Sequence, residues 1–527
     1  MADLLPELIF RSADHTPDRD ALVFEQQALS YGDLSTLVRK TASGLIDLGL
    51  ERQERVAVYL EKRPETVMAM FGSAAAGGVF VPINPLLKAE QVAYILQDCN
   101  VRILVTSSER LRSLQAAITR CHKLRAIVLV DGEKFSLPAP QLVLARWKEI
   151  SATSSSRNPH RCIDNDMAAI LYTSGSTGKP KGVVLSHRNM VTGAKSVAKY
   201  LQNTPSDKIL TVLPFSFDYG LSQLTTAFCK AACSVLLNYL LPRDVLVAAE
   251  RYRITGLAAV PPLWIQLASL EWPRAVVEQL RYITNSGGAM PTAVVETLSK
   301  KLPKTEIFLM YGLTEAFRST YLPPTQLKRR PDSIGKAIPN AEVFVVREDG
   351  SLCTPNEPGE LVHRGALVAM GYWNDPGKTA ERFKPSPSQA PGLTLPEIAV
   401  WSGDTVRMDE EGFLYFVARR DEMIKTSGYR VSPTEIEEVL YATGLVGEAV
   451  AVGVPHPVLG QVIVVVAAPA IAERSLDDEQ LMEECKRRLP GFMVPAHIAV
   501  QDALPRNPNG KIDRKTLASE LAQLFAG

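Results

Sequence analysis

The sequence predicts an α/β protein with a large N-terminal body and a small α+β domain at the C-terminal end. Short apolar runs, such as residues 56–60 (VAVYL) and 126–130 (AIVLV), alternate with helical patterns such as residues 65–76. Strands that are apolar on both faces and separated by helices are typical of a parallel sheet covered by helices. After residue 333 the runs become shorter and are broken by Gly, Pro and acidic turns, which indicates a β-barrel-like subdomain.

The elements follow this alternation along the chain. The expected strands are residues 56–60, 79–83, 103–106, 126–130, 167–173, 209–214, 234–238, 256–260, 282–289 and 306–312. Polar residues 151–161 and Pro-rich residues 384–397 predict surface loops. The charged run ARRDE at residues 418–422 ends the body, so we expect two domains, at residues 1–420 and 421–527.

Composition and charge exclude several classes of protein. The chain has 58 Lys+Arg and 57 Asp+Glu, a net charge of +1, which leaves no basic excess for nucleic acid. Its apolar runs are shorter than the roughly 20 residues that span a membrane, and its N-terminus lacks the pattern of a signal peptide. The 7 cysteines are scattered and odd in number, unlike a disulfide framework. We therefore expect a cytoplasmic protein without a membrane span.

Residues 172–182 (YTSGSTGKPKG) follow a buried-type strand and combine three glycines, four hydroxyl residues and two lysines. Glycines allow backbone N–H groups to surround an anion, while hydroxyls and lysines add donors and positive charge. The segment is not a Walker loop, because Thr173 stands where that loop needs glycine and Pro180 follows Lys179. It predicts a phosphate-binding loop.

Six further segments follow in order: SGGA (286–289), YGLTE (311–315), GELVHRGALVAMGYW (359–373), WSGD (401–404), RRDEMIKTSGYRVSPTEIE (419–437) and NPNGKIDR (507–514). Together with the loop they resemble the motifs of the adenylate-forming (AMP-binding) superfamily, which includes acyl-CoA synthetases, luciferases and non-ribosomal peptide adenylation domains. The resemblance implies an AMP-forming ligase that uses ATP and Mg²⁺. It converts a carboxylate into an acyl-adenylate and transfers the acyl group to a thiol.

The resemblance also implies residue roles. Thr314 would contact the α-phosphate, Glu315 would hold Mg²⁺, and Lys511 would bridge the reacting carboxylate and the α-phosphate. The small domain would be mobile, with Asp421 as its hinge and Lys425 and Gly428 serving the thiol step. The expected nucleotide-binding residues are Thr173, Ser174, Gly175, Ser176, Thr177, Gly178, Lys179, Lys181, Gly287, Gly288, Ala289, Tyr311, Asp404 and Arg419. The sequence departs from the family at Trp401, usually Tyr, and at Ala418, usually Gly.

Residues 214–220 (PFSFDYG) stand where the acid-binding pocket of the family begins, so they bear on the identity of the acid substrate. Phe-Asp resembles amino-acid adenylation domains, whose aspartate pairs with the substrate ammonium, and a buried Asp218 needs such a partner. The alternative role of Asp218 is to cap the following helix. Phe217, Tyr219 and Trp264 are the other expected substrate-binding residues.

Two versions of the reaction remain open. The first is an amino-acid ligase that loads the phosphopantetheine of a separate carrier protein. The second is an acyl-CoA synthetase that joins a fatty or aryl acid to CoA. A luciferase-like oxygenase has no support beyond family membership, and a catalytically dead scaffold conflicts with the presence of Glu315 and Lys511.

Overall fold

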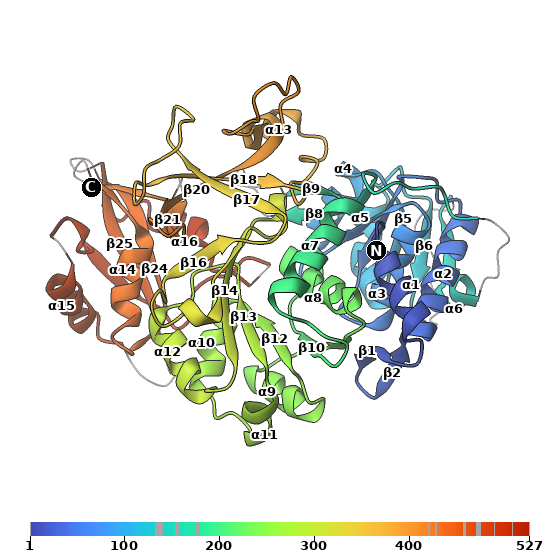
Figure 1. Cartoon of the computed structure of the whole chain (residues 1–527), viewed down its shortest axis with the longest axis horizontal. Coiled ribbons are helices and arrows are strands. Elements are labelled where there is room, and N and C mark those ends of the chain that lie inside the picture. The colour runs from blue at the N-terminus through green and yellow to red at the C-terminus, as the bar shows by residue number, and fades with distance from the viewer. Residues whose placement is uncertain are drawn as a thin grey trace.

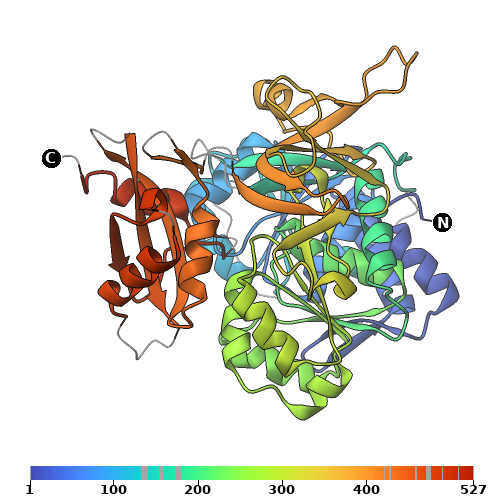
Figure 2. The same ribbon diagram turned by 60° about the vertical axis from the view of Figure 1, so that its left-hand side comes forward.

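The computed structural model describes residues 2–131, 141–152, 158–173, 180–419, 422–426, 429–456, 460–470, 476–489, 491–508 and 510–525. Strands in these residues form three sheets. Two sheets belong to the body and one to a smaller C-terminal unit, which lies beside the body in both views (Figures 1 and 2). The α/β class with a large body and a small C-terminal domain is therefore confirmed.

The first sheet has seven strands in the order β7-β6-β5-β3-β4-β8-β9. All neighbouring pairs are parallel except β8 and β9, which form an antiparallel pair. The strands are β3 (Arg55–Tyr59), β4 (Val79–Pro82), β5 (Val101–Thr106), β6 (Ala126–Leu129), β7 (Val143–Arg146), β8 (Met167–Thr173) and β9 (Lys181–Ser186). The accompanying helices are α2 (Tyr31–Asp47), α3 (Pro64–Ala75), α4 (Ala89–Asp98), α5 (Ser108–Ile118) and α6 (Trp147–Ala152).

The second sheet has fourteen strands, and its central part is parallel. This part contains β1 (Asp20–Phe24), β10 (Lys208–Thr211), β11 (Cys233–Leu236), β12 (Gly256–Ala259), β13 (Tyr282–Asn285) and β14 (Glu306–Tyr311), and β2 (Gln27–Ser30) pairs antiparallel with β1. Its helices are α1 (Glu7–His15), α7 (His187–Tyr200), α8 (Asp218–Cys229), α9 (Pro242–Arg251), α10 (Pro261–Ser269), α11 (Arg274–Gln279) and α12 (Thr292–Lys301).

Antiparallel strands extend this sheet from β14 outward in the order β15-β16-β21-β20-β18-β17. They are β15 (Thr320–Tyr321), β16 (Ser333–Ala337), β17 (Ala341–Val346), β18 (Gly359–Gly365), β20 (Ile398–Met408) and β21 (Leu414–Arg419), with β19 (Phe383–Pro385) and α13 (Pro376–Arg382) beside β20. The segment is antiparallel, as its short strands predict. Among the described strands it forms an open extension that ends at β17.

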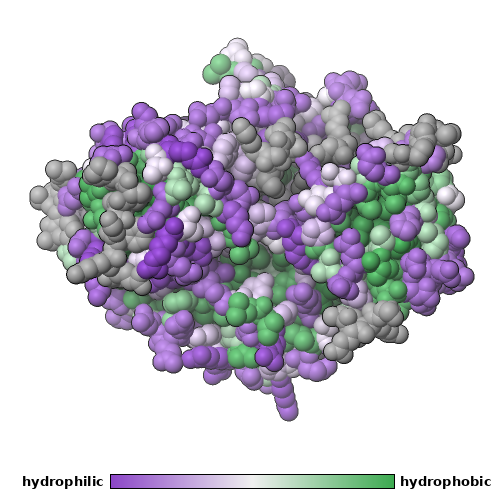
Figure 3. Space-filling view, turned by 180° about the vertical axis from the view of Figure 1, so that it is seen from behind, coloured by the Kyte–Doolittle hydropathy of each residue, from purple (hydrophilic) through white to green (hydrophobic). Residues whose placement is uncertain are grey.

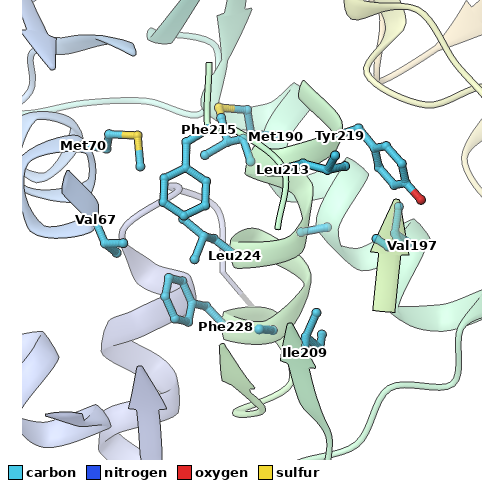
Figure 4. Packing of buried hydrophobic residues seen from close by; sticks show 14 of the residues in the cluster. Val67, Met70, Met190, Val197, Ile209, Leu213, Phe215, Tyr219, Leu224 and Phe228 are labelled. Atoms are coloured by element: carbon cyan, nitrogen blue, oxygen red, sulfur yellow. The ribbon is translucent and has the colours of Figure 1, made fainter. Parts of the chain in front are cut away.

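Helix α8 packs in the body between the two sheets. Leu224 and Phe228 point toward Val67 and Met70 of α3, whereas Tyr219 points to the opposite side, toward Val197 (Figure 4). The Phe228 ring packs edge-on against Phe71 of α3, with ring centroids 5.3 Å apart. The face of α8 that carries Leu224 and Phe228 therefore packs against α3, and the face that carries Tyr219 points to the opposite side.

The C-terminal unit contains a five-stranded sheet of β22 (Ile424–Thr426), β23 (Tyr429–Val431), β24 (Val446–His456), β25 (Gly460–Pro469) and β26 (His497–Val500). Its helices α14 (Pro433–Tyr441) and α15 (Asp478–Arg488) pack in one core and α16 (Arg514–Glu520) in another. The unit contacts the body at Asn84, whose amide donates to the Pro508 carbonyl at 2.6 Å. In the rear view, hydrophobic residues gather on its side of the molecule (Figure 3).

Two further expectations can be compared with the fold. All seven cysteines are unpaired. In the described part of the chain, no helix is long and apolar enough to cross a membrane.

Candidate active site

Several of the expected site residues lie at one edge of the large sheet. The parallel strands β10, β12, β13 and β14 end there, and the segments that follow β10, β13 and β14 carry Phe217–Asp218, Ser286–Gly287 and Thr314–Glu315. Ligand sites of α/β sheets lie outside the carboxyl ends of parallel strands, because these segments converge there. The body therefore supplies most of the site.

The phosphate loop connects an antiparallel hairpin. Thr173 ends β8 and pairs with Lys181, the first residue of β9. The six expected loop residues Ser174, Gly175, Ser176, Thr177, Gly178 and Lys179 lie outside the described residues. The Lys181 ammonium lies 5.4 Å from the Tyr372 ring centroid. Burial, followed by repulsion from Lys378, lowers the pKa of Lys181, and nearby carboxylates, including Glu315, oppose this shift.

Thr314 and Glu315 stand in a short 3-10 helix, η1 (Thr314–Ala316), directly after β14. The Tyr372 hydroxyl donates to Glu315 Oε1 at 2.6 Å. Burial raises the pKa of Tyr372 above its usual range, and the Glu315 charge raises it further. No group of three or more His, Cys, Asp or Glu side chains in the described residues could hold a metal. A Mg²⁺ ion bound here would need Glu315 together with phosphate oxygens, which are ligands that this ion prefers.

The nucleotide side of the site joins β14 to β20. The Tyr311 hydroxyl donates to Asp404 Oδ2 at 2.5 Å. In the β20–β21 ladder, the backbone of Asp404 lies opposite the backbone of Arg419. Ala418, the departure from the family pattern, is a buried strand residue opposite Thr405. The pairing of β20 with β21 shifts register next to this residue, between Thr405 and Val406.

Lys511 reaches this edge from the C-terminal unit. Its ammonium lies 5.2 Å from the Phe217 ring centroid. Gly287 has φ +85°, and a Cβ built there would lie 3.2 Å from Lys511 Cε. A side chain at Gly287 would be strained and would crowd the lysine, so glycine suits both needs. Gly288 and Ala289, which follow, are exposed.

Asp218 is the first residue of α8, and Phe217 occupies the N-cap position. The alternative of a capping aspartate is therefore wrong for this helix. Asp218 is only 4% exposed and accepts a hydrogen bond from the Thr314 hydroxyl at 3.1 Å. Burial raises the pKa of Asp218, although the Arg318 and Lys511 charges oppose the shift.

The other expected residues are placed as follows. Tyr219 is buried, and its hydroxyl lies 2.5 Å from that of Thr284. Trp264 is a core residue whose indole N–H donates to the carbonyls of Ala259 and Thr284 at 3.0 and 3.1 Å. It supports the strand ends through these bonds. Lys425 has its backbone in β22, and Asp421 and Gly428 lie outside the described residues.

Sequence reasoning missed two residues that the fold brings to the site. Tyr372 bonds to Glu315, and Arg318 lies 4.7 Å from the Tyr219 ring centroid while its Nη1 donates to Ser286 Oγ at 2.9 Å. Each lies within or directly after a quoted motif, which was the available signal.

Comparison with known proteins agrees with this geometry. The model of the AMP-binding enzymes matches residues 9–373, and that of the AMP-binding enzyme C-terminal domain matches residues 435–511. The chain belongs to the AMP-binding enzyme family.

Individual relatives fall into two groups. Tyrocidine synthase 3 of Brevibacillus parabrevis is 30% identical over 518 residues, which cover 97% of this chain but only 8% of that much longer protein. A long-chain-fatty-acid–CoA ligase of Bacillus subtilis is 29% identical, and the match covers 98% of this chain and 94% of the ligase. The solved structure of o-succinylbenzoate coenzyme A synthetase from Bacillus subtilis with ATP and magnesium is 25% identical, covers 98% of both chains and has a TM-score of 0.80.

Proposed function

We propose that the chain is an ATP-dependent, AMP-forming ligase that activates a small amino acid and transfers it to the phosphopantetheine thiol of a separate carrier protein. In the first step, a carboxylate oxygen of the acid attacks the α-phosphorus of ATP, and pyrophosphate leaves. In the second step, the thiol sulfur attacks the acyl carbon, its proton passes to solvent, and AMP leaves. Both steps depend on stabilising negative charge.

The side chains at the sheet edge suit the first step. Lys511, held beside Phe217, supplies a compact positive charge for oxygens of the acid and the α-phosphate. Tyr311 and Asp404 form a hydrogen-bonded pair in position to hold the adenosine part. Glu315, oriented by Tyr372, would hold Mg²⁺, which neutralises phosphate charge when bound. The Thr314 hydroxyl bonds to Asp218 and would turn to a phosphate oxygen.

The observation that carries the choice of an amino acid is the environment of Asp218. This carboxylate is buried, and in the described part of the chain it forms no ion pair within 4 Å. A buried negative charge is costly unless a cation pairs with it. The ammonium of an amino acid, whose carboxylate lies at Lys511, would provide that cation.

A fatty or aryl acid with CoA as acceptor is the second candidate. It is favoured by the match to the long-chain-fatty-acid–CoA ligase over nearly its whole length. The cavity beside Tyr219 measures about 20 Å³, so a long acyl chain would need a larger displacement of the lining side chains than a short acid would. Pockets that enclose ligands of ordinary size occupy about 300–1,000 Å³.

The thiol step would use a different placement of the C-terminal domain. We expect residues 421–527 to rotate about Asp421 against residues 1–420, which withdraws Lys511 and brings the segment of Lys425 and Gly428 to the site. Such hinged closure is common between two half-reactions at one site. The seven unpaired cysteines favour a reducing compartment such as the cytoplasm.

The test is an acid-dependent exchange of labelled pyrophosphate into ATP. Amino acids should support exchange, and their deaminated analogues should not. Exchange with the deaminated acids alone would refute the amino-acid proposal in favour of the second candidate. The acceptor is then identified by mass spectrometry, with a phosphopantetheinylated carrier protein and CoA offered in parallel.

A further inference from the structure

A small cavity lies along the face of α8 that carries Tyr219. It is lined by Tyr219, Gln223, Thr226, Tyr282, Met310 and Arg318, among others. Gln223 and Thr226 follow Asp218 by five and eight residues, so they lie about 7 and 12 Å further along the helix axis at 1.5 Å per residue. The cavity therefore extends away from the reaction centre, where the far end of a bound acid would lie.

Arg318 is the charged residue of this cavity, and it is only 1% exposed. Its Nη1 donates to Ser286, but its Nε and Nη2 have no hydrogen-bond partner among the described residues. Thr226 Oγ1 and Gln223 Oε1 are also buried without a partner there. Buried polar groups in native proteins are nearly always hydrogen-bonded, and unpaired donors on a buried guanidinium are costly. The two Arg318 nitrogens and the Thr226 hydroxyl can donate to acceptor oxygens of a ligand, whereas Gln223 Oε1 can only accept a hydrogen bond.

The two cations of the site, Lys511 and Arg318, each lie over an aromatic ring. Lys511 lies over the Phe217 ring at 5.2 Å, and Arg318 lies over the Tyr219 ring at 4.7 Å. The two rings are perpendicular, with centroids 6.1 Å apart. Asp218 stands between them in the chain and interacts electrostatically with both cations. The site thus holds two separate positive groups with one negative group between them.

Asp218 does not account for the free nitrogens of Arg318. The two side chains form no ion pair within 4 Å in the described structure, and the aspartate accepts from Thr314 instead. Elsewhere in the protein a buried arginine is fully engaged. Arg330, which also lies over an aromatic ring, pairs with both Asp409 and Glu411. Arg318 therefore differs from Arg330 in forming no ion pair within 4 Å among the described residues.

We propose that Arg318 binds a second carboxylate of the acid, so that the substrate is a short dicarboxylic acid. This inference rests on the proposed adenylation. The reacting carboxylate lies at Lys511, the second carboxylate accepts from Nε and Nη2 of Arg318, and the Thr226 hydroxyl can also donate to it. If the acid is also an amino acid, its ammonium pairs with Asp218, and the substrate resembles aspartate or glutamate. The cavity volume of about 20 Å³ is close to what one water molecule needs, so a bound carboxylate would displace side chains that line the cavity, and a long chain would displace more of them.

The test compares acids that differ only in the second charge, by pyrophosphate exchange: aspartate with asparagine, glutamate with glutamine, and succinate and glutarate with their monoamides. We expect kcat/KM for the best diacid to exceed that for its amide by about 100-fold or more, since a site built for a buried group rejects an analogue that lacks it. Arg318→Met should lower the ratio of diacid to amide kcat/KM by about 100-fold or more. Arg318→Lys should restore part of the diacid use.

Arg330→Met serves as the matched control, because it removes a buried arginine that lies outside the site. It should leave the ratio of diacid to amide use unchanged, whatever its effect on stability. If Arg318→Met does not fold, Thr226→Val replaces the unpartnered hydroxyl with a group of the same shape. This variant should lower diacid use by about fivefold, and amide use by less, since a hydrogen bond contributes about 1 kcal/mol and one to a charged group contributes more.

The outcomes separate the two proposals. If no acid supports exchange in the wild-type enzyme, the proposed function fails. If neutral acids support exchange as well as diacids do, or if Arg318→Met reduces both classes equally, only the role of Arg318 is refuted. Preference for succinate or glutarate over the amino diacids would support Arg318 and refute the ammonium partner of Asp218.

Discussion

The substitution Asp218→Asn separates the function of this carboxylate from its effect on stability. Asparagine has nearly the same shape and keeps an oxygen that can accept the bond from Thr314, which is 3.1 Å long in the wild type. It removes only the negative charge. Stability and amino-acid use should therefore change in opposite directions.

The magnitudes follow from burial. Because Asp218 is buried and its pKa is raised, its ionised carboxylate is less stable in the folded protein than in the unfolded chain. Removing the charge should therefore raise the free energy of unfolding. Loss of a buried partner for the ammonium should cost about 2–5 kcal/mol, or roughly 30- to 5,000-fold in kcat/KM.

The sign of the pH dependence can be checked in the same experiment. With the folded pKa above the unfolded value, the wild type loses stability relative to the variant as pH rises through the interval between the two values. Denaturant unfolding should therefore show a difference at neutral pH that shrinks below about pH 4, the ordinary range of aspartate. Pyrophosphate exchange measures the loss of activity. An equal loss for amino acids and their deaminated analogues, or a destabilised variant, would refute the reasoning.

Four further predictions concern the reaction. As pH falls, Asp218 should protonate earlier than an exposed aspartate, so kcat/KM for an amino acid should fall in the acid range while that for its deaminated analogue stays constant. Lys511→Ala should lower adenylate formation by about 100- to 1,000-fold and leave thiol transfer from supplied acyl-adenylate within about threefold, measured as separate half-reactions. Tyr311→Phe, which removes the bond to Asp404, should raise the KM for ATP by about tenfold in steady-state kinetics. Glu315→Gln should raise the Mg²⁺ concentration for half-maximal rate by about tenfold or more in a metal titration.

Matched variants control these measurements. Lys486 is an exposed lysine of the same C-terminal unit, and its replacement by Ala should change neither half-reaction. Tyr415→Phe removes a similar bond, to Asp409 at 3.1 Å, and should leave the KM for ATP unchanged. Equal losses in both half-reactions of Lys511→Ala would contradict the domain rotation. A Tyr415→Phe effect as large as that of Tyr311→Phe would contradict the role of Tyr311.

Several features could be read from the sequence because they depend on local chemistry. Apolar runs such as residues 126–130 predicted parallel strands, since a strand buried on both faces must be apolar throughout. The motifs around Tyr311, Thr314 and Lys511 predicted which residues would gather, and the fold places all three at one sheet edge or beside it. These residues could be identified from the sequence because the residues of each motif are contiguous in the chain and the motifs follow in a fixed order.

Tertiary structure alone decided how these residues act on one another. In the sequence, an aspartate that caps a helix cannot be distinguished from one that lines a binding pocket. The fold shows that Phe217 occupies the N-cap position of α8 and that Asp218 is buried. Arg318 belongs to no recognised pattern, because its importance arises from what lies around it: a cavity and two nitrogens without a partner among the described residues. Burial and missing partners are properties of contacts between distant segments. The sequence alone therefore determined the family, whereas the burial of Asp218 and Arg318, on which the proposed choice of acid rests, is a property of the tertiary structure.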